Sequence, residues 1–320
     1  MSNSPPRPIL RRAHRALIDA INRLGWVVAP TSDYYHPLRP VSELRRHAGR
    51  WSRPGHMAGI SFDLPAMMES LEGMIAAYGA EHAALPSYEE LKGRKHGPGF
   101  TRVDALTLYL MLRHHKPARY LEVGSGLSTD YAVLAAAKNA AEGRPVRMTV
   151  VDPFMTEATR GLQKQGIEVI PREAQDLAVE EYTRLEAGDV LFIDTTHVVR
   201  IDGEVPYLVL EVLPALKPGV LVHIHDIHFP FYVPIDPNAY VFDRRWPMLF
   251  TEPMLVQAYL SYNPRVEIAM STPLLRHYHE DFLRRVVPGY RPLDPRGFDT
   301  HHGSLWLRCL EGPPVVQRIG

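Results

Sequence analysis

The sequence predicts an α/β protein with a Rossmann-like, doubly wound sheet of about seven mostly parallel strands. From Phe100 onward, short apolar runs alternate with stretches of helical periodicity, which is typical of a parallel sheet buried on both faces. The residues before Phe100 show helical patterns and no strand-like alternation. We therefore expect a helical cap or lid over 1–98, an α/β domain over 99–310 and a tail over 311–320.

The expected elements follow one another along the chain. Two amphipathic patterns, 13–24 and 64–78, each end at a glycine, and the glycine-rich stretch 92–99 is expected to be a hinge. A helix at 102–113 precedes the first strand. A stretch rich in proline and aromatic residues, 229–262, is expected to be an insertion over the active site. The predicted strands are 120–123, 147–151, 168–170, 190–193, 220–224, 266–270 and 304–307.

The composition limits the classes of partner and the compartment. The chain has 36 basic and 36 acidic residues, so no charge pattern favours a nucleic acid or an anionic membrane as partner. No run approaches the roughly 20 apolar residues that span a bilayer. The single cysteine, Cys309, has no partner for an internal disulfide. We expect a cytoplasmic protein with no nucleic-acid or membrane partner, and the oligomeric state, a homo-oligomer included, stays open.

The most informative segment is 120–129, Tyr-Leu-Glu-Val-Gly-Ser-Gly-Leu-Ser-Thr. It ends a strand, turns at Gly124 and Gly126, and opens a helix at Ser128 or Thr129, both good capping residues. The glycines let the backbone approach a ligand at the carboxyl ends of the strands, where open α/β sheets bind their ligands. Because Thr129 stands where a dinucleotide fingerprint has its third glycine, the turn does not match a dinucleotide site.

Two acidic residues favour a positively charged nucleoside ligand. Glu122 stands two residues before the first glycine, where its carboxylate would repel a pyrophosphate but attract an ammonium or sulfonium group. Asp152 ends the second strand and is placed to accept both hydroxyls of a ribose.

At these residues the chain resembles the class I S-adenosylmethionine-dependent methyltransferases, in particular their small-molecule O-methyltransferase branch. The resemblance covers about 100–310 and includes the segment 188–194 as the fourth strand and 216–219 as the turn into the fifth. It implies S-adenosylmethionine as cofactor and a hydroxyl of a small natural-product or sugar-type acceptor as the site of methylation. The cofactor-binding residues that it implies are Glu122, Gly124, Ser125, Gly126, Ser128, Asp152, Pro153, Gln175, Asp176 and Asp194.

The chemistry is expected where the fourth and fifth strands end. Asp194 ends one, His225 and Asp226 end the other, and neighbouring strands lie about 5 Å apart. In one hypothesis these three residues hold a divalent cation, as in metal-dependent relatives of the catechol O-methyltransferase type. The histidine favours manganese, iron or zinc over magnesium. In the other, His197 or His225 is a general base that a nearby carboxylate such as Asp194 orients.

Other interpretations stay open. Asp194 could cap the following helix while the histidines bind main chain. The whole protein could be a non-catalytic S-adenosylmethionine-fold binding module, or a metal-dependent hydroxylase or hydrolase on the same fold. Around the crevice, the loop 229–246 with Arg244 is expected to cover the acceptor. The pair His301 and His302 is expected at the surface.

Overall fold

The computed structural model describes residues 8–28, 30, 34–35, 38–93, 99–233, 235–294 and 298–312. The chain divides into two compact units, 1–48 and 49–320. The first contains α1 (Pro8–Arg23) and α2 (Val41–Arg46). No helix of the described ranges combines the length and the apolar character that crossing a membrane requires. Most of the expected hinge and nearly all of the expected tail lie outside these ranges.

Unit 49–320 is built on a seven-stranded sheet in the order β3-β2-β1-β4-β5-β7-β6. The strands β1 to β5 pair in parallel, whereas β7 runs antiparallel to both β5 and β6. All seven predicted strands are present, which confirms the expected fold class. Their bounds are β1 (Arg119–Val123), β2 (Arg147–Val151), β3 (Glu168–Ile170), β4 (Val190–Ile193), β5 (Leu221–Ile224), β6 (Val266–Ser271) and β7 (Leu305–Cys309).

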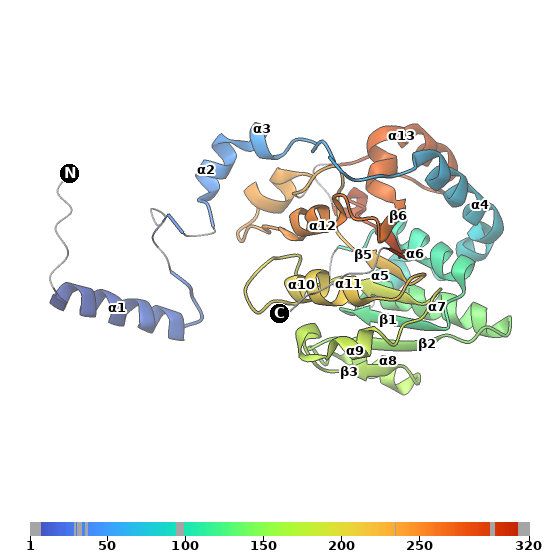
Figure 1. Cartoon of the computed structure of the whole chain (residues 1–320), viewed down its shortest axis with the longest axis horizontal. Coiled ribbons are helices and arrows are strands. Elements are labelled where there is room, and N and C mark those ends of the chain that lie inside the picture. Colours follow the sequence, from blue (N-terminus) through green and yellow to red (C-terminus); the bar gives the residue numbers. More distant parts are fainter. Residues whose placement is uncertain are drawn as a thin grey trace, which may run out of the picture. The chain divides into compact units, whose positions relative to one another are not determined.

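The central strands are buried along their whole length because helices cover both faces of the sheet (Figure 1). The register places Val123 opposite Val151 on one side and Ile193 on the other, and Ile193 opposite Ile224. The carboxyl ends of β1, β2, β4 and β5 are therefore level with one another. Every functional residue predicted from strand ends lies along this one edge.

The helices of this unit fall into two packed groups. One surrounds α6, and the other surrounds a continuous helical segment between β4 and β5, of which Leu208–Val212 has π-helical hydrogen bonding. The first group is α4 (Leu64–Ala83), α5 (Tyr88–Lys92), α6 (Arg102–His115), α7 (Leu127–Ala141) and α13 (Thr272–Val286). The second is α9 (Val179–Tyr182), α10 (Glu204–Tyr207), the π segment, α11 (Leu213–Ala215) and α12 (Glu252–Leu260). Two further helices are α3 (Ala48–Trp51) and α8 (Glu157–Lys164).

The helix expected to end before Gly79 continues to Ala83. A glycine inside a helix costs about 1 kcal/mol, which tertiary contacts readily offset. Here the last turn of α4 carries Glu81, which pairs with the buried guanidinium of Arg113 on α6 (Nε–Oε1 2.6 Å). The helices α4 and α5 thus belong to the same unit as the sheet, whereas the sequence placed a division at 98/99.

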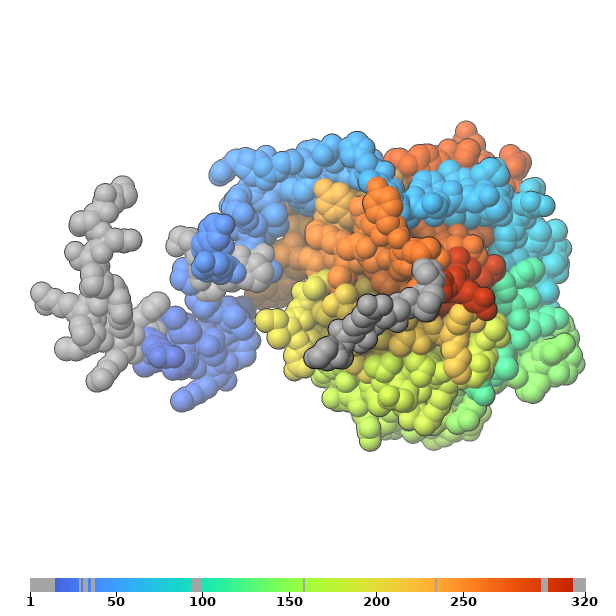
Figure 2. Space-filling model, viewed as in Figure 1, coloured from blue at the N-terminus to red at the C-terminus, as the bar shows by residue number. Residues whose placement is uncertain are grey.

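The stretch between α3 and α4 is hydrogen-bonded to two later segments of the same unit, one after β5 and one before β6. The backbone N–H of Tyr262 donates to the carbonyl of Gly59 at 2.7 Å, and the N–H of Gly55 donates to that of Pro230 at 2.8 Å. Figure 2 shows these blue and orange segments side by side on one face. Two hydrogen bonds thus tie this stretch to segments that are distant from it in sequence.

Candidate active site

A cavity of about 300 Å³ opens at the carboxyl ends of β1, β2 and β4. It lies where open α/β sheets bind their ligands. The predicted cofactor residues that line it are Gly124, Ser125, Asp152, Pro153, Gln175 and Asp194. Four others, Glu122, Gly126, Ser128 and Asp176, are not among its lining residues.

The two glycines of the turn, Gly124 and Gly126, differ in the space that the chain leaves for a side chain. Gly124 has φ +87°, and a Cβ there would lie 1.9 Å from the carbonyl oxygen of Asp194. The close approach of β1 and β4 therefore requires this glycine. At Gly126 a Cβ would meet no atom of the chain within 4 Å. Because the chain's own packing leaves that space open, a ligand can approach the backbone there.

Asp152 holds the turn and also faces the cavity. Its Oδ2 accepts hydrogen bonds from the backbone N–H of Ser125 (3.0 Å) and from the Ser125 hydroxyl. Its Oδ1 accepts from the backbone N–H of Phe154 at 2.8 Å. An ionised carboxylate offers about four accepting positions, so one remains for a ligand hydroxyl. The acid predicted for the ribose is thus also a structural element of the glycine turn.

Glu122 lies beneath the turn and is fully buried. Its Oε1 accepts from the hydroxyl of Ser128 at 2.5 Å. Burial outweighs the hydrogen bonds from Ser128 and Thr129 and raises the pKa of Glu122 to about 8. The side chain is therefore mostly protonated at neutral pH. This geometry gives no support to its predicted role of attracting a cation by charge.

The two cofactor-binding residues predicted after the third strand, Gln175 and Asp176, differ in their position relative to the cavity. Gln175 lines the cavity, and its amide donates to Glu173 Oε2 at 2.5 Å and to the carbonyl of Asp202 at 3.3 Å. Asp176 is exposed. Its adjacency to Gln175 in sequence does not bring it to the cavity, because the two side chains leave this short helical turn in different directions.

A second cavity of about 300 Å³ adjoins the first, since Asp194, Thr195 and Thr196 line both. Its polar side is formed by the ends of β4 and β5, and its apolar side by the segment after β5. The other lining residues are Gly99, His197, His225, Asp226, Tyr240, Arg244, Met248 and Phe250. The structure thus brings together all the residues predicted for catalysis and for the metal, and part of the insertion 229–262.

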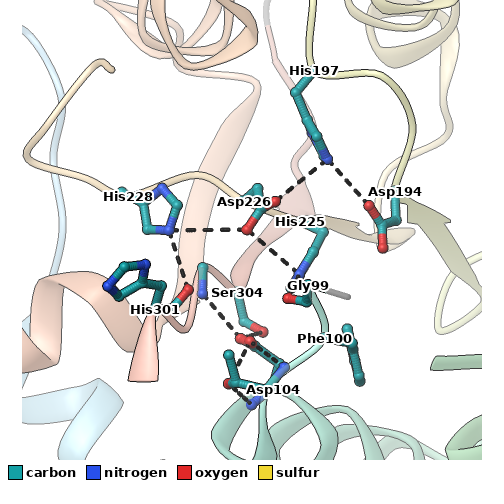
Figure 3. A network of polar contacts seen from close by, with 12 residues as sticks. Gly99, Phe100, Asp104, Asp194, His197, His225, Asp226, His228, His301 and Ser304 are labelled. Carbon is teal, nitrogen blue, oxygen red and sulfur yellow. Dashed lines mark hydrogen bonds and ion pairs between the residues drawn. The ribbon is translucent and has the colours of Figure 1, made fainter. Parts of the chain in front are cut away.

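The ring of His197 points toward Asp194 and Asp226 (Figure 3). Its Nε2 lies 3.2 Å from Asp194 Oδ1 and 3.6 Å from Asp226 Oδ2, and its Nδ1 lies 2.8 Å from Glu252 Oε2. Burial would lower the pKa of His197, but these carboxylates raise it well above its usual value. The ring therefore carries a positive charge, which balances part of the surrounding negative charge.

The two carboxylates around His197 differ in acidity. Burial would raise the pKa of Asp194, but His225 and His197 lower it to about 2. Burial raises the pKa of Asp226 to about 6, although the same two histidines oppose the shift. Asp194 is thus firmly ionised, whereas Asp226 can take up a proton near neutral pH.

His225 is also engaged with the chain itself. Its Nε2 lies 3.2 Å from the carbonyl oxygen of Gly99 and 3.6 Å from Asp226 Oδ1, and its ring packs on Phe100. Burial would lower the pKa of His225, but Asp194 and Asp226 raise it to about 8. This ring nitrogen must donate to Gly99, so it offers no lone pair to the cavity.

The prediction that His301 and His302 lie at the surface is wrong. Both are almost fully buried, at 1% and 0% exposure. The Nε2 of His301 lies 3.1 Å from the carbonyl of Asp294, and its ring stacks on Tyr240, a lining residue of the second cavity. A double histidine is polar in sequence, but here the loop before β7 turns it inward.

Two buried acids of this region were not predicted. Glu252, at the start of α12, pairs with His197 across 55 residues. One oxygen of Asp104 on α6 accepts from the hydroxyl of Thr101, the N-cap residue, and the other accepts from Ser304 Oγ (2.7 Å) and from the N–H of Gly303 (3.1 Å). The capping pattern Thr-x-x-Asp was a detectable signal for Asp104. Nothing local in the sequence marks Glu252.

The predicted metal site has no counterpart in the described ranges. They contain no group of three or more His, Cys, Asp or Glu side chains placed to hold a metal ion. Asp194, His225 and Asp226 do lie together, but their facing atoms contact histidine nitrogens.

Residues 121–227 match the protein family described as "Methyltransferase domain". The matched range begins within β1, contains the glycine turn and Asp152, and ends just after Asp226. The chain carries a methyltransferase domain. This match agrees with the predicted methyltransferase family, and the order and direction of the seven strands agree with its Rossmann-like fold.

Other known proteins are similar to this chain at identities below 25%. An uncharacterized protein from Archaeoglobus fulgidus is 23% identical over 180 residues, which are 52% of this chain and 78% of the relative. One solved structure is that of the O-methyltransferase TomG from Streptomyces achromogenes, which is involved in tomaymycin synthesis and was solved with SAM. It is 15% identical to this chain. The match covers 79% of this chain and 92% of TomG, with a TM-score of 0.40. An O-methyltransferase from Bacillus cereus, solved with SAH, is 14% identical, with 84% and 97% covered and a TM-score of 0.41.

Proposed function

We propose that this chain transfers a methyl group from S-adenosylmethionine to a hydroxyl oxygen of a small molecule. The observation that carries the proposal is the pair of adjoining cavities that share Asp194, Thr195 and Thr196. One lies at the glycine turn of the methyltransferase domain, and the other lies at the cluster of acids and histidines. Two ligands bound in these cavities would meet at the shared wall, as an in-line transfer requires.

The first cavity fits a nucleoside cofactor. Gly124 and Ser125 bring the backbone of the turn to its wall, and Asp152 retains an accepting position for a hydroxyl. The residues that would hold the cofactor are Gly124, Ser125, Asp152, Pro153 and Gln175. When bound, S-adenosylmethionine supplies a methyl group on a positively charged sulfur. Asp194, on the shared wall, would offset that charge with its ionised carboxylate.

The second cavity fits a small acceptor with a hydroxyl group. Tyr240, Met248 and Phe250 give it an apolar side, and Asp226 faces it with a carboxylate. A hydroxyl that is methylated must lose its proton, and Asp226 can receive it because its pKa is raised to about 6, close to neutral pH. In this scheme His197 and His225, both engaged with other groups of the chain, orient the carboxylates and balance their charge.

Calorimetric titration with S-adenosylmethionine and S-adenosylhomocysteine tests the cofactor, with and without a chelator. We expect both to bind in the micromolar range and the chelator to have no effect. If neither binds, the cofactor assignment is wrong. Binding of both without methyl transfer to any of a panel of hydroxylated acceptors would favour the non-catalytic binding module instead.

The acceptor cavity is tested by the substitution Met248→Trp. Because Met248 lines the second cavity and not the first, the larger side chain should fill the acceptor space only. We expect affinity for S-adenosylhomocysteine to stay unchanged and methyl transfer to fall at least tenfold. The conservative control Met248→Leu should retain activity. A loss of cofactor affinity in Met248→Trp would show that the two cavities have been assigned wrongly.

A further inference from the structure

The space between Asp194 and Asp226 is filled by the ring of His197. The distances of 3.2 and 3.6 Å place one ring nitrogen, Nε2, within reach of both carboxylates. The other ring nitrogen is taken by Glu252 at 2.8 Å. All three acids are more than half buried, with side-chain exposures of 30% for Asp194, 10% for Asp226 and 1% for Glu252.

Hydrogen-bond accounting then fixes the state of the ring. Ionised carboxylates accept hydrogen bonds and cannot donate them. For both nitrogens of His197 to bind carboxylates, each must carry a proton, and the ring is an imidazolium. Three carboxylates surround this one ring, and His225 Nε2 lies next to the cluster, 3.6 Å from Asp226 Oδ1.

The backbone holds His197 in this place. The residue has φ +59° and Asp226 has φ +54°, so both adopt the left-handed conformation, which aims their side chains toward each other from the ends of adjacent strands. The carbonyl of His197 accepts from the N–H groups of Thr251 (2.9 Å) and Glu252 (3.0 Å) at the start of α12. Its ring also packs on Phe250, with 4.6 Å between centroids.

We propose that His197 takes the place of a metal ion: its ring bridges Asp194 and Asp226, so this cavity holds no divalent cation in the native protein. A cation that bound both carboxylates would have to displace the ring from three acids and from the aromatic face of Phe250. His197 is thus a positioning residue that fixes the two carboxylates at the shared wall of the cavities. The inference does not rest on the proposed methyl transfer, because it is tested by metal binding and ring protonation.

Removing the ring tests the proposal directly. We expect the native protein to bind no Mn²⁺ in electron paramagnetic resonance titrations, whereas His197→Ala, with three carboxylates around an empty space, should bind one Mn²⁺ per chain. The matched control is the double variant His197→Ala/Asp226→Asn, which should lose most of that binding. Stoichiometric metal in the native protein would overturn the proposal. So would a folded His197→Ala variant, shown by an unchanged circular dichroism spectrum, that binds no Mn²⁺.

A second measurement is made on the native protein, so it does not depend on whether His197→Ala folds. Nitrogen-15 NMR of the histidine rings, with His197 assigned from the conservative variant His197→Gln, reports whether both ring nitrogens carry protons. We expect the imidazolium pattern for His197 at pH 7 and above, where an ordinary histidine is neutral. A neutral ring with one bare nitrogen at pH 7 would contradict the bridge between the carboxylates.

Discussion

At the scale of single residues, Asp152 combines a structural and a binding task. Three of its accepting positions hold Ser125 and Phe154, which fixes the glycine turn, and the carboxylate still faces the first cavity. An acid at this place can therefore form the site and contact the ligand at once. The turn and the cofactor are expected to stabilise each other.

The substitution Asp152→Asn tests this dual role. The amide keeps the size of the side chain but has only one accepting oxygen, so a ligand hydroxyl would lose its partner. We expect affinity for S-adenosylhomocysteine to fall by roughly 1–3 kcal/mol, measured by calorimetry. Asp176→Asn is the control, because Asp176 is exposed and does not line the cavity. Equal losses in the two variants would contradict the assignment of Asp152.

Glu122 gives a prediction about stability and pH. The pKa of Glu122 is about 8 in the folded protein and near its usual value of 4.5 in the unfolded chain, so the unfolded chain loses the proton first. The stability of the native protein should therefore fall as pH rises from about 4.5 to about 8. Glu122→Gln cannot ionise and escapes this loss. Relative to the native protein, the variant should gain about 3 kcal/mol in unfolding free energy between about pH 5 and about pH 8, measured by urea denaturation. An unchanged difference at the two pH values would contradict the buried, protonated state.

At the scale of elements, Arg113 ties three helices together. Its guanidinium, 1% exposed, pairs with Glu81 at the end of α4 and with Glu142 just after α7, and it also donates to Asn139 within α7. The hydroxyl of Tyr109 donates to the same Glu81. The helix α4 is thus fastened to the helices that cover the sheet, although the sequence assigned it to a separate cap.

Removal of this guanidinium should loosen the α4 contact. Arg113→Met keeps much of the buried volume but leaves the acids without their cation. We expect a loss of about 2–3 kcal/mol in unfolding free energy. This loss is smaller than the full cost of breaking a buried ion pair, because Glu81 is partly exposed. Urea denaturation measures it. The control Lys116→Met removes an exposed partner of Glu142 and should change stability little. Equal effects of the two substitutions would show that burial does not decide the outcome.

At the scale of the whole molecule, the division of the chain lies at 48/49. Every buried apolar residue of the described ranges, from Met57 onward, belongs to unit 49–320. The same unit contains both cavities and every predicted site residue. It therefore has the core and the site that an independent domain needs.

Truncation tests this independence. A chain that begins at Gly49 should keep the melting temperature of the main transition and the affinity for S-adenosylhomocysteine, because no buried apolar residue among those described is lost. Differential scanning calorimetry and a ligand titration measure the two quantities. Aggregation of the shortened chain, or loss of its affinity, would mean that residues 1–48 complete the folded unit.

The sequence by itself determined the strands, their order along the chain and the glycine turn at the carboxyl end of β1. Short apolar runs and the turn at Gly124 and Gly126 are local signals, because burial on both faces and close backbone approach act on neighbouring residues. The same locality explains why Asp152, Asp194 and Asp226 were placed correctly at strand ends.

Only the tertiary structure decided how these residues act. Glu252 reaches His197 from 55 residues away, and burial moves the pKa of Glu122 and Asp226 toward neutral pH. The tertiary structure also buries His301, and it places the ring of His197 between the carboxylates for which the sequence suggested a metal. Charge, desolvation and hydrogen-bond partners depend on every group that packs around a side chain, and most of those groups are distant in sequence.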